Sequence, residues 1–263
     1  MKISLFAFML LSVLLYAPSA GASSFADSLV NSFRIEPCCA SPIAVCAAQK
    51  PKCKMAPRLA DFVRWMDSTG RVTNERMVEA LQERYNTLTD RKRNTSDLQG
   101  WPVIGDRNAP LTVVMYYSIT CPVCKTNFRE LQPAVTRGPL QGKVRIVAKP
   151  LGAPLNKALI VAHDFGRFAD FKLALAAVGG RIDEQVILAI ADDLFFDREL
   201  FMARMDSPDV VSRLEASSEE AKTNQVEFVP TYFINGRRYN SVSNPRWIID
   251  AIEYVYETEF SNR

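Results

Sequence analysis

Hydrophobic positions in the first third of the chain recur at helical spacing. They fall at Phe25, Leu29, Val30 and Phe33, and residues 59–66 and 77–88 each place apolar side chains on one helical face. Between these stretches lies PCCASPIAVCAAQKPKCK, residues 37–54, whose prolines rule out one continuous helix. The pattern predicts a small, cysteine-rich α-helical region over residues 23–88, followed by a polar linker without apolar periodicity over residues 89–100.

A different pattern begins at residue 101. Residues 111–117 form a β-branched and aromatic run, residues 122–131 have helical spacing, and residues 143–149 alternate as a strand, which together predict a βαβ unit. From residue 154 to about 224 nearly every segment has helical spacing. The sequence VPTYFINGRRYN, residues 229–240, then predicts two strands joined at Asn235 and Gly236. A last helix is expected to begin with Asn244 as its N-cap and Pro245 as its first residue.

This order of elements predicts an α/β class protein with a thioredoxin-like fold. Residues 101–263 would form the thioredoxin-like domain, with a helical insertion at about residues 152–224, and the small cysteine-containing helical region would precede it.

The N-terminus has the pattern of a secretory signal peptide. Lys2 precedes an apolar run over residues 3–16, and the small residues that follow supply an A-x-A cleavage pattern at residues 20–22. The run is shorter than the roughly 20 residues that span a bilayer, so we expect no stable membrane insertion. Residues 1–22 are therefore predicted to be removed and the protein to be periplasmic or secreted, with an uncleaved signal anchor as the alternative.

Charge and compartment narrow the possible functions. The chain has 32 basic and 29 acidic residues, a balance that gives no electrostatic basis for binding nucleic acid or an acidic substrate. Its dense basic run, Arg91-Lys92-Arg93, is interpreted as part of a solvated linker. Because disulfides persist outside the cytosol, disulfide chemistry is the first interpretation for all six cysteines.

Two cysteines, Cys121 and Cys124, lie at the seam between the first predicted strand and its helix. Pro122 would occupy the first helical position, and the spacing of three puts both sulfurs on one side of the first turn, within disulfide reach. The helix N-terminus favours a thiolate by up to about 2 kcal/mol, enough to lower the pKa of Cys121 by about one unit. Cys121 is thus the candidate nucleophile and Cys124 the resolving thiol. A zinc site and a structural disulfide are the alternatives, although His163 is the only histidine available as a further zinc ligand.

Residues 101–258 resemble the DsbA-like family of thioredoxin-fold disulfide oxidoreductases. The resemblance is carried by GDRNAPLTVVMYYSITCPVCK, KPLGAPLNKALIVAHDF and VEFVPTYFINGRRY. It implies that Cys121 and Cys124 are the redox pair and that Pro230, after Val229, is the family's cis-proline, which faces the pair and contacts substrate. It also implies disulfide exchange with cysteines of exported proteins, no cofactor, and a redox partner that recycles the pair.

Two departures from the family qualify this expectation. Many relatives have an acidic residue six positions before the first cysteine, where this chain has Met115, which leaves the proton route of the buried thiol unassigned. The dipeptide Pro122-Val123 lacks the histidine of the strongest oxidants, so we expect a weaker oxidant. The alternatives are a reductase or isomerase, or a non-catalytic binding or metal-handling module.

The remaining cysteines, Cys38, Cys39, Cys46 and Cys53, are not explained by the family. Because adjacent cysteines rarely bond each other, Cys38 and Cys39 are expected to pair separately with Cys46 and Cys53, in either order. These bridges could staple the helical region, exchange electrons with Cys121 as a relay, or be replaced by metal binding.

Overall fold

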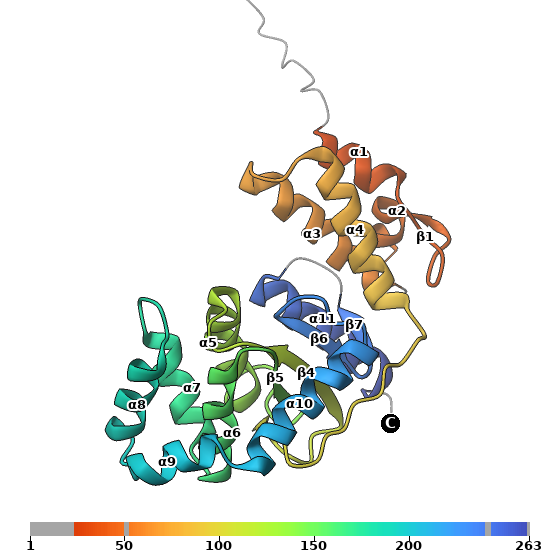
Figure 1. The fold of residues 1–263 in the computed structure, drawn as a ribbon. Coiled ribbons are helices and arrows are strands. Elements are labelled where there is room, and N and C mark those ends of the chain that lie inside the picture. The colour runs from red at the N-terminus through yellow and green to blue at the C-terminus, as the bar shows by residue number, and fades with distance from the viewer. Residues whose placement is uncertain (1–23, 50–52, 240–242, 262–263) are drawn as a thin grey trace, which may run out of the picture.

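The structure is a computed structural model that describes residues 24–49, 53–239 and 243–261 (Figure 1). The predicted signal peptide lies outside the described residues. The N-terminal region is helical, as its periodicity predicted, and a short β-ladder interrupts it where the prolines occur. Its elements are α1 (Phe25–Ser32), β1 (Arg34–Ile35), β2 (Ser41–Pro42), α2 (Ile43–Ala48), α3 (Met55–Thr69) and α4 (Asn74–Thr89).

Local signals account for where these helices begin and end. The side chain of Ser24 accepts a hydrogen bond from the backbone N–H of Asp27 at the start of α1, and Thr73 does the same for Arg76 at the start of α4. Both satisfy a backbone donor that has no partner inside the helix. Gly70 ends α3 in a left-handed conformation with φ of 60°, which glycine adopts without steric penalty.

A five-stranded mixed sheet has the strand order β3-β5-β4-β6-β7. Only β4 and β5 run parallel, with Leu111 opposite Val144, and every other neighbouring pair is antiparallel. The central βαβ unit and the C-terminal hairpin agree with the sequence prediction, whereas the edge strand β3 was not predicted. The strands are β3 (Val103–Gly105), β4 (Leu111–Tyr117), β5 (Val144–Pro150), β6 (Thr231–Ile234) and β7 (Arg237–Tyr239).

In the thioredoxin-like part of the chain, several helices form a long insertion between β5 and β6. As predicted, the chain from residue 154 to 224 is mostly helical, and α11 begins at Pro245 with Asn244 as its N-cap. The helices are α5 (Pro122–Thr136), the 3₁₀ turn η1 (Pro154–Asn156), α6 (Lys157–Asp164), α7 (Phe168–Ala177), α8 (Glu184–Asp193), α9 (Arg198–Met205), α10 (Pro208–Thr223) and α11 (Pro245–Glu259). The result is a thioredoxin-like fold.

The two faces of the sheet are buried by different elements. Side chains of one face, including Val113 and Met115, join the main hydrophobic core with residues of α5 and α11. Val114, Tyr116 and Phe233 point to the other face and pack against Ala221 of α10. Alternate residues of β4 therefore serve different layers, as the pleat of a strand requires.

The polar stretch at residues 89–100 lies along the sheet. The backbone N–H of Asn94 donates to the carbonyl of Gly236 over 2.8 Å, and the N–H of Asp97 donates to the carboxylate of Glu220 over 2.8 Å. Arg93 pairs with Glu259 over 2.9 Å. Residues 90–100 have no regular structure, in agreement with their composition, but these contacts attach the stretch to the sheet, to α10 and to α11.

The N-terminal helices pack on the thioredoxin-like part through α11, which α3 and α4 both contact (Figure 1). Arg84 of α4 is 0% exposed, and its guanidinium carbon lies 4.9 Å from the ring centroid of Phe62 and 5.1 Å from that of Trp247. Its Nη1 donates to the backbone carbonyl of Trp247 over 3.1 Å. A buried cation between two rings thus joins α3 and α4 to α11.

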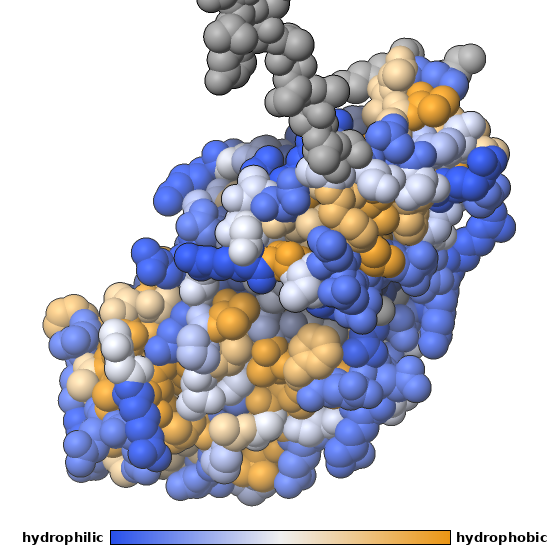
Figure 2. Space-filling view, turned by 90° about the horizontal axis from the view of Figure 1, so that it is seen from above, coloured by the Kyte–Doolittle hydropathy of each residue, from blue (hydrophilic) through white to orange (hydrophobic). Residues whose placement is uncertain are grey.

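None of the helices in the described ranges has the length and apolarity needed to cross a membrane. Hydrophobic residues reach the surface in separate patches with hydrophilic residues between them, as the view from above shows (Figure 2).

Candidate redox site

The two cysteines lie where β4 leads into α5. Cys121 is the N-cap of α5 and has an extended backbone, with φ of −83° and ψ of 115°. Its Sγ accepts a hydrogen bond from the backbone N–H of Cys124 over 3.2 Å, so the sulfur takes the place that a serine or aspartate oxygen usually takes at an N-cap. Pro122 occupies the first helical position, where its missing N–H leaves no hydrogen bond unmade.

A buried asparagine fixes the loop that presents Cys121. Asn156, in η1, accepts the N–H of Ile119 over 2.8 Å and donates to the carbonyl of Leu151 over 2.8 Å and to Ser118 Oγ over 3.3 Å. One side chain therefore joins the loop after β4 to the loop after β5. Sequence reasoning missed this residue, because an asparagine two positions after a proline is a common turn signal and gives no indication of a distant partner.

The two thiols differ in exposure and in acidity. Cys121 is partly exposed, whereas Cys124 is 1% exposed. The hydrogen bond from the Cys124 side chain lowers the pKa of Cys121 to about 6; burial opposes this shift, and the N–H groups of Cys124 and Val123 and the charge of Lys172 add to it. The same hydrogen bond, together with burial, raises the pKa of Cys124. Cys121 is thus a thiolate at neutral pH while Cys124 keeps its proton.

The Val229–Pro230 segment lies against the exposed sulfur. The peptide bond before Pro230 is cis, as the sequence resemblance implied, and the protonated thiol of Cys121 donates to the Val229 carbonyl over 3.5 Å. Two large apolar side chains adjoin the site in sequence and are exposed: Val123 at 43% and Phe228 at 61%. An apolar, accessible surface therefore flanks the one thiol that is open to solvent.

A lysine that the sequence analysis did not single out also lies here. Lys172 of α7 is 1% exposed, and its ammonium lies 4.7 Å from the ring centroid of Tyr117 and 5.3 Å from that of Phe128. Burial lowers its pKa to about 8, while the charges of Cys124 and Cys121 act in the opposite direction. The signal in the sequence is a lysine inside the largely apolar helix FADFKLALAA, whose other charged residue, Asp170, lies in the first turn. Met115, at the position where many relatives have an acid, is buried.

The four N-terminal cysteines form two disulfides, Cys38–Cys53 and Cys39–Cys46. This is one of the two pairings that the sequence left open. Cys46 and Cys53 are buried in the core between the short helices, whereas their partners are partly exposed.

The histidine lies apart from this chemistry. His163 is in the last turn of α6, and burial lowers its pKa. Among the residues that the structure describes, no group of three or more His, Cys, Asp or Glu side chains is arranged to hold a metal ion.

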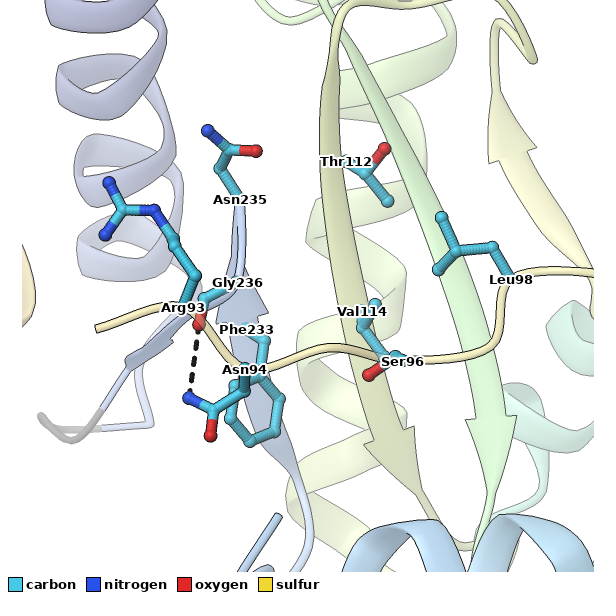
Figure 3. Close-up of a pocket in the computed structure, with 9 residues that line it drawn as sticks. All are labelled: Arg93, Asn94, Ser96, Leu98, Thr112, Val114, Phe233, Asn235 and Gly236. Atoms are coloured by element: carbon cyan, nitrogen blue, oxygen red, sulfur yellow. Dashed lines mark hydrogen bonds between the residues drawn. The ribbon is translucent and has the colours of Figure 1, made fainter. Parts of the chain in front are cut away.

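A cavity of about 370 Å³ lies elsewhere, between the 89–100 stretch and strands β4 and β6 (Figure 3). Val114 and Phe233 contribute to its lining, and the side chain of Asn94 spans it at one end by donating to the Gly236 carbonyl over 3.2 Å. Neither Cys121 nor Cys124 is among its lining residues. This cavity is therefore on the sheet face that α10 covers and is separate from the redox pair.

Among solved structures, three similar folds cover nearly the full length of their own chains. A thioredoxin-like oxidoreductase from Silicibacter pomeroyi is 22% identical with a TM-score of 0.54, covering 60% of this chain and 94% of that one. BdbD from Bacillus subtilis is 18% identical with a TM-score of 0.56, and the match covers 63% of this chain and 97% of BdbD. The catalytic domain of Proteus mirabilis ScsC is 16% identical with a TM-score of 0.52, covering 68% and 98%. These likenesses show the fold.

Two relatives that are similar to this chain over part of their length are Na⁺/H⁺ antiporters. Na⁺/H⁺ antiporter NhaA 1 of Salinispora arenicola is 27% identical over 169 residues, which is 60% of this chain and 24% of that protein. The NhaA antiporter of Herminiimonas arsenicoxydans is 25% identical over 160 residues, or 57% and 24%. The chain thus spans about a quarter of the length of these relatives. A family model described as thioredoxin matches residues 97–253, more than half of the chain, and the protein therefore belongs to the thioredoxin family.

Proposed function

We propose that the protein is a thiol–disulfide oxidoreductase of the DsbA type that oxidises cysteines of exported proteins. The observation that carries the proposal is the asymmetry of the pair. Cys121 is accessible and has a pKa of about 6, whereas Cys124 is buried with a raised pKa. A thiolate is the nucleophile and the better leaving group in disulfide exchange, so this asymmetry supports Cys121 as the group that attacks and is released.

The reaction proceeds in two exchanges. A substrate thiolate attacks Sγ of Cys121, the Cys121–Cys124 bond breaks, and Cys124 leaves and takes up a proton. A second substrate thiolate then attacks the substrate sulfur of this mixed disulfide, and Cys121 leaves as a thiolate. The substrate loses two electrons to form its disulfide, and the pair Cys121 and Cys124 gains them. A redox partner must reoxidise the pair for a further turnover.

The acidity of Cys121 supports the oxidising direction. Stabilising the thiolate stabilises the reduced protein, which makes its disulfide more oxidising. A pKa of about 6 lies between roughly 7 in thioredoxin and roughly 3.5 in DsbA. This supports an oxidant weaker than the strongest relatives. A reductase or isomerase would use the same groups in the opposite direction.

The site itself supports the assignment of substrate contact to Val229 and Pro230. The Val229 carbonyl lies beside the Cys121 sulfur, and the exposed Phe228 precedes it. A substrate segment that places its cysteine at Cys121 would thus meet a free apolar surface and nearby backbone. The Pro122-Val123 dipeptide would form the other side of this contact.

Placement in the cell remains part of the proposal. The predicted signal peptide at residues 1–22 would direct the protein to the periplasm or outside, and residues 23–88, 89–100 and 101–263 would be the helical region, the linker and the thioredoxin-like domain. From this placement we expect cysteine-containing exported proteins as substrates and a redox partner that recycles the pair. We expect no binding of nucleic acid. Antiport is not carried over from the NhaA relatives, because the match covers only 24% of their length.

Two assays test the function and its direction. The oxidised protein should form the disulfide of a two-cysteine model peptide faster than the reduced protein reduces insulin with a dithiol present. The control is the double variant Cys121→Ser and Cys124→Ser, which retains both N-terminal disulfides. Fast insulin reduction with slow peptide oxidation would favour the reductase, and no activity in either assay with the fold intact would favour a non-catalytic binding or metal-handling module.

A further inference from the structure

The ammonium group of Lys172 is placed next to the turn that carries Cys124. It lies 5.3 Å from the ring centroid of Phe128, and Phe128 follows Cys124 by one helical turn on the same face of α5. On its other side the ammonium lies 4.7 Å from the ring of Tyr117, the last residue of β4 before the loop to Cys121. Three elements, α7, α5 and β4, therefore enclose this cation at the buried side of the redox pair.

No hydrogen-bond acceptor meets this cation within the described part of the chain. Its Nζ has no hydrogen-bond partner, and neither does the neighbouring Tyr117 hydroxyl. The charged groups that act on it are Cys124, Cys121 and Lys125, all at or near the start of α5; none comes from α6 or α8, which also pack on α7. A buried ammonium is stable only when an opposite charge compensates it. The groups that can supply this charge are the two sulfurs.

We propose that Lys172 exchanges a proton with the Cys124 thiol during disulfide exchange, an inference that rests on the proposed function. The chain needs such a group, because Cys124 is buried and must lose its proton before it can attack Cys121. The acidic residue that many DsbA-like relatives place on the first central strand is absent, and Met115 stands in its place. Lys172 comes from the helical insertion instead, and its charge interacts with those of Cys124 and Cys121.

In the mixed disulfide, Cys121 is bonded to substrate and carries no charge, and Cys124 and Lys172 share one proton. When the proton is on Lys172, the Cys124 thiolate attacks Cys121, the substrate leaves as a thiolate, and the ammonium, now without a counter-charge, releases its proton to solvent. In the oxidising direction Lys172 takes a proton from solvent as Cys124 leaves and passes it to the sulfur. A second solvent proton is held by Lys172 when Cys121 becomes a thiolate.

This coupling sets the number of protons that accompany reduction. With Lys172, the reduced pair holds one proton on Cys124 and one on Lys172, so two protons accompany two electrons between the pKa values of about 6 for Cys121 and about 8 for Lys172. Without the amine only one proton is taken up in this interval. When two redox couples differ by one proton taken up on reduction, the equilibrium constant between them changes about tenfold per pH unit.

The equilibrium with dithiothreitol, which carries two protons when reduced, counts these protons directly. Between pH 7 and pH 8 the equilibrium constant for reducing wild-type protein is expected to change by no more than about twofold, and that of Lys172→Met to rise about tenfold. Methionine keeps most of the side-chain volume, and circular dichroism checks the fold. The matched control is Lys125→Gln, which removes a cation beside Cys124 whose Nζ contacts the Val178 carbonyl over 3.4 Å. It should behave as wild type.

The inference is overturned if the equilibrium constant for reducing the wild-type protein rises tenfold between pH 7 and pH 8. It is also overturned if the constant for Lys172→Met does not change over this interval. If this variant does not fold, the wild-type measurement decides alone. Dithiothreitol replaces the protein substrate, so the result is independent of activity. A flat wild-type constant together with no peptide oxidation contradicts the proposed function, whereas a steep wild-type constant with full peptide oxidation contradicts only the role of Lys172.

Discussion

The Sγ of Cys121 lies 3.2 Å from the backbone nitrogen of Cys124, which places the exposed thiol inside the field of the helix that the buried thiol belongs to. The N-terminal N–H groups of α5 therefore stabilise negative charge on one sulfur and not on the other. The spacing Cys-x-x-Cys alone does not say which cysteine is the nucleophile and which is the resolving thiol. This geometry distinguishes them.

The two cysteines should respond differently to replacement by serine. Cys121→Ser should abolish exchange, because the accessible nucleophile is gone. Cys124→Ser should accumulate mixed disulfides with substrate, because no buried thiol remains to displace it. Non-reducing gels and intact-mass spectrometry measure the trapped species. Equal trapping by both variants would show that the assignment of roles is wrong.

Alkylation of Cys121 should depend on pH with a midpoint near 6. The thiolate is the reactive form, so the rate with iodoacetamide rises as pH increases through the pKa of about 6 and then levels off. In Cys124→Ala the midpoint should move upward, because the side-chain hydrogen bond is the largest cause of the lowered pKa. A wild-type midpoint near 8.5, the ordinary value of a thiol, or an unchanged midpoint in the variant, would contradict the electrostatic account.

The sequence was sufficient where a structure depends on local patterns. The β4-α5-β5 unit, the hairpin at Asn235 and Gly236 and the start of α11 all follow from periodicity, turn residues and caps that lie within a few positions of one another. Strand β3 was missed, because three residues at a sheet edge are too few to show alternation. The continuation of α5 past Pro133 was missed as well, since proline within a helix normally signals its end.

The residues of the site also fall into those that local sequence patterns predict and those that they do not. Cys121, Cys124 and Pro230 carry motifs that can be identified in sequence. Asn156 contacts a residue 37 positions away, and Lys172 meets α5 only after the insertion has folded back onto it. Such contacts arise from tertiary packing, and no periodicity in the chain encodes which distant residues will meet.

A buried ion pair should contribute to stability on the opposite face of the sheet. Lys149 Nζ lies 2.7 Å from each carboxylate oxygen of Glu220, and the backbone of Asp97 contacts both side chains. Glu220→Gln should lower the free energy of unfolding by about 3 kcal/mol, because it leaves the buried Lys149 ammonium uncompensated. Denaturant titration measures the change.

The neighbouring exposed pair supplies the control. Glu219→Gln removes the partner of Lys222, whose side chain is largely exposed, and should change the unfolding free energy by less than about 0.5 kcal/mol. The double variant Lys149→Met and Glu220→Gln should lose less than the sum of the single losses. The pKa of Glu220 is lowered against the effect of burial by its hydrogen bond from Lys149, so this stability is present above pH of about 4.5 and is lost as pH falls through the folded-state pKa. Equal losses at Glu219 and Glu220 would contradict a special role for the buried pair.

The two N-terminal disulfides should act as staples of unequal strength. Cys38–Cys53 closes 15 residues and Cys39–Cys46 closes 7, so the loop-entropy model gives about 3 kcal/mol for the first and about 2 to 2.5 kcal/mol for the second. Serine pairs at each bridge should show this order in thermal unfolding of residues 24–88, while peptide oxidation by Cys121 persists.

Redox behaviour separates the staples from a relay. If the bridges are structural, a reductant titration should show two events, with the Cys121–Cys124 disulfide reduced first, because the helix stabilises its reduced thiolate. Removing all four N-terminal cysteines should then leave turnover with a recycling oxidant unchanged. Two results together would instead establish the relay. The variant would recycle slowly although the potential of its Cys121 pair is unchanged, and disulfide mapping of the wild-type protein by mass spectrometry would find a transient bridge from Cys121 to an N-terminal cysteine. Both bridges include one sulfur buried in the core, at Cys46 and Cys53, and a buried sulfur is poorly placed for exchange, which is why we expect the staples.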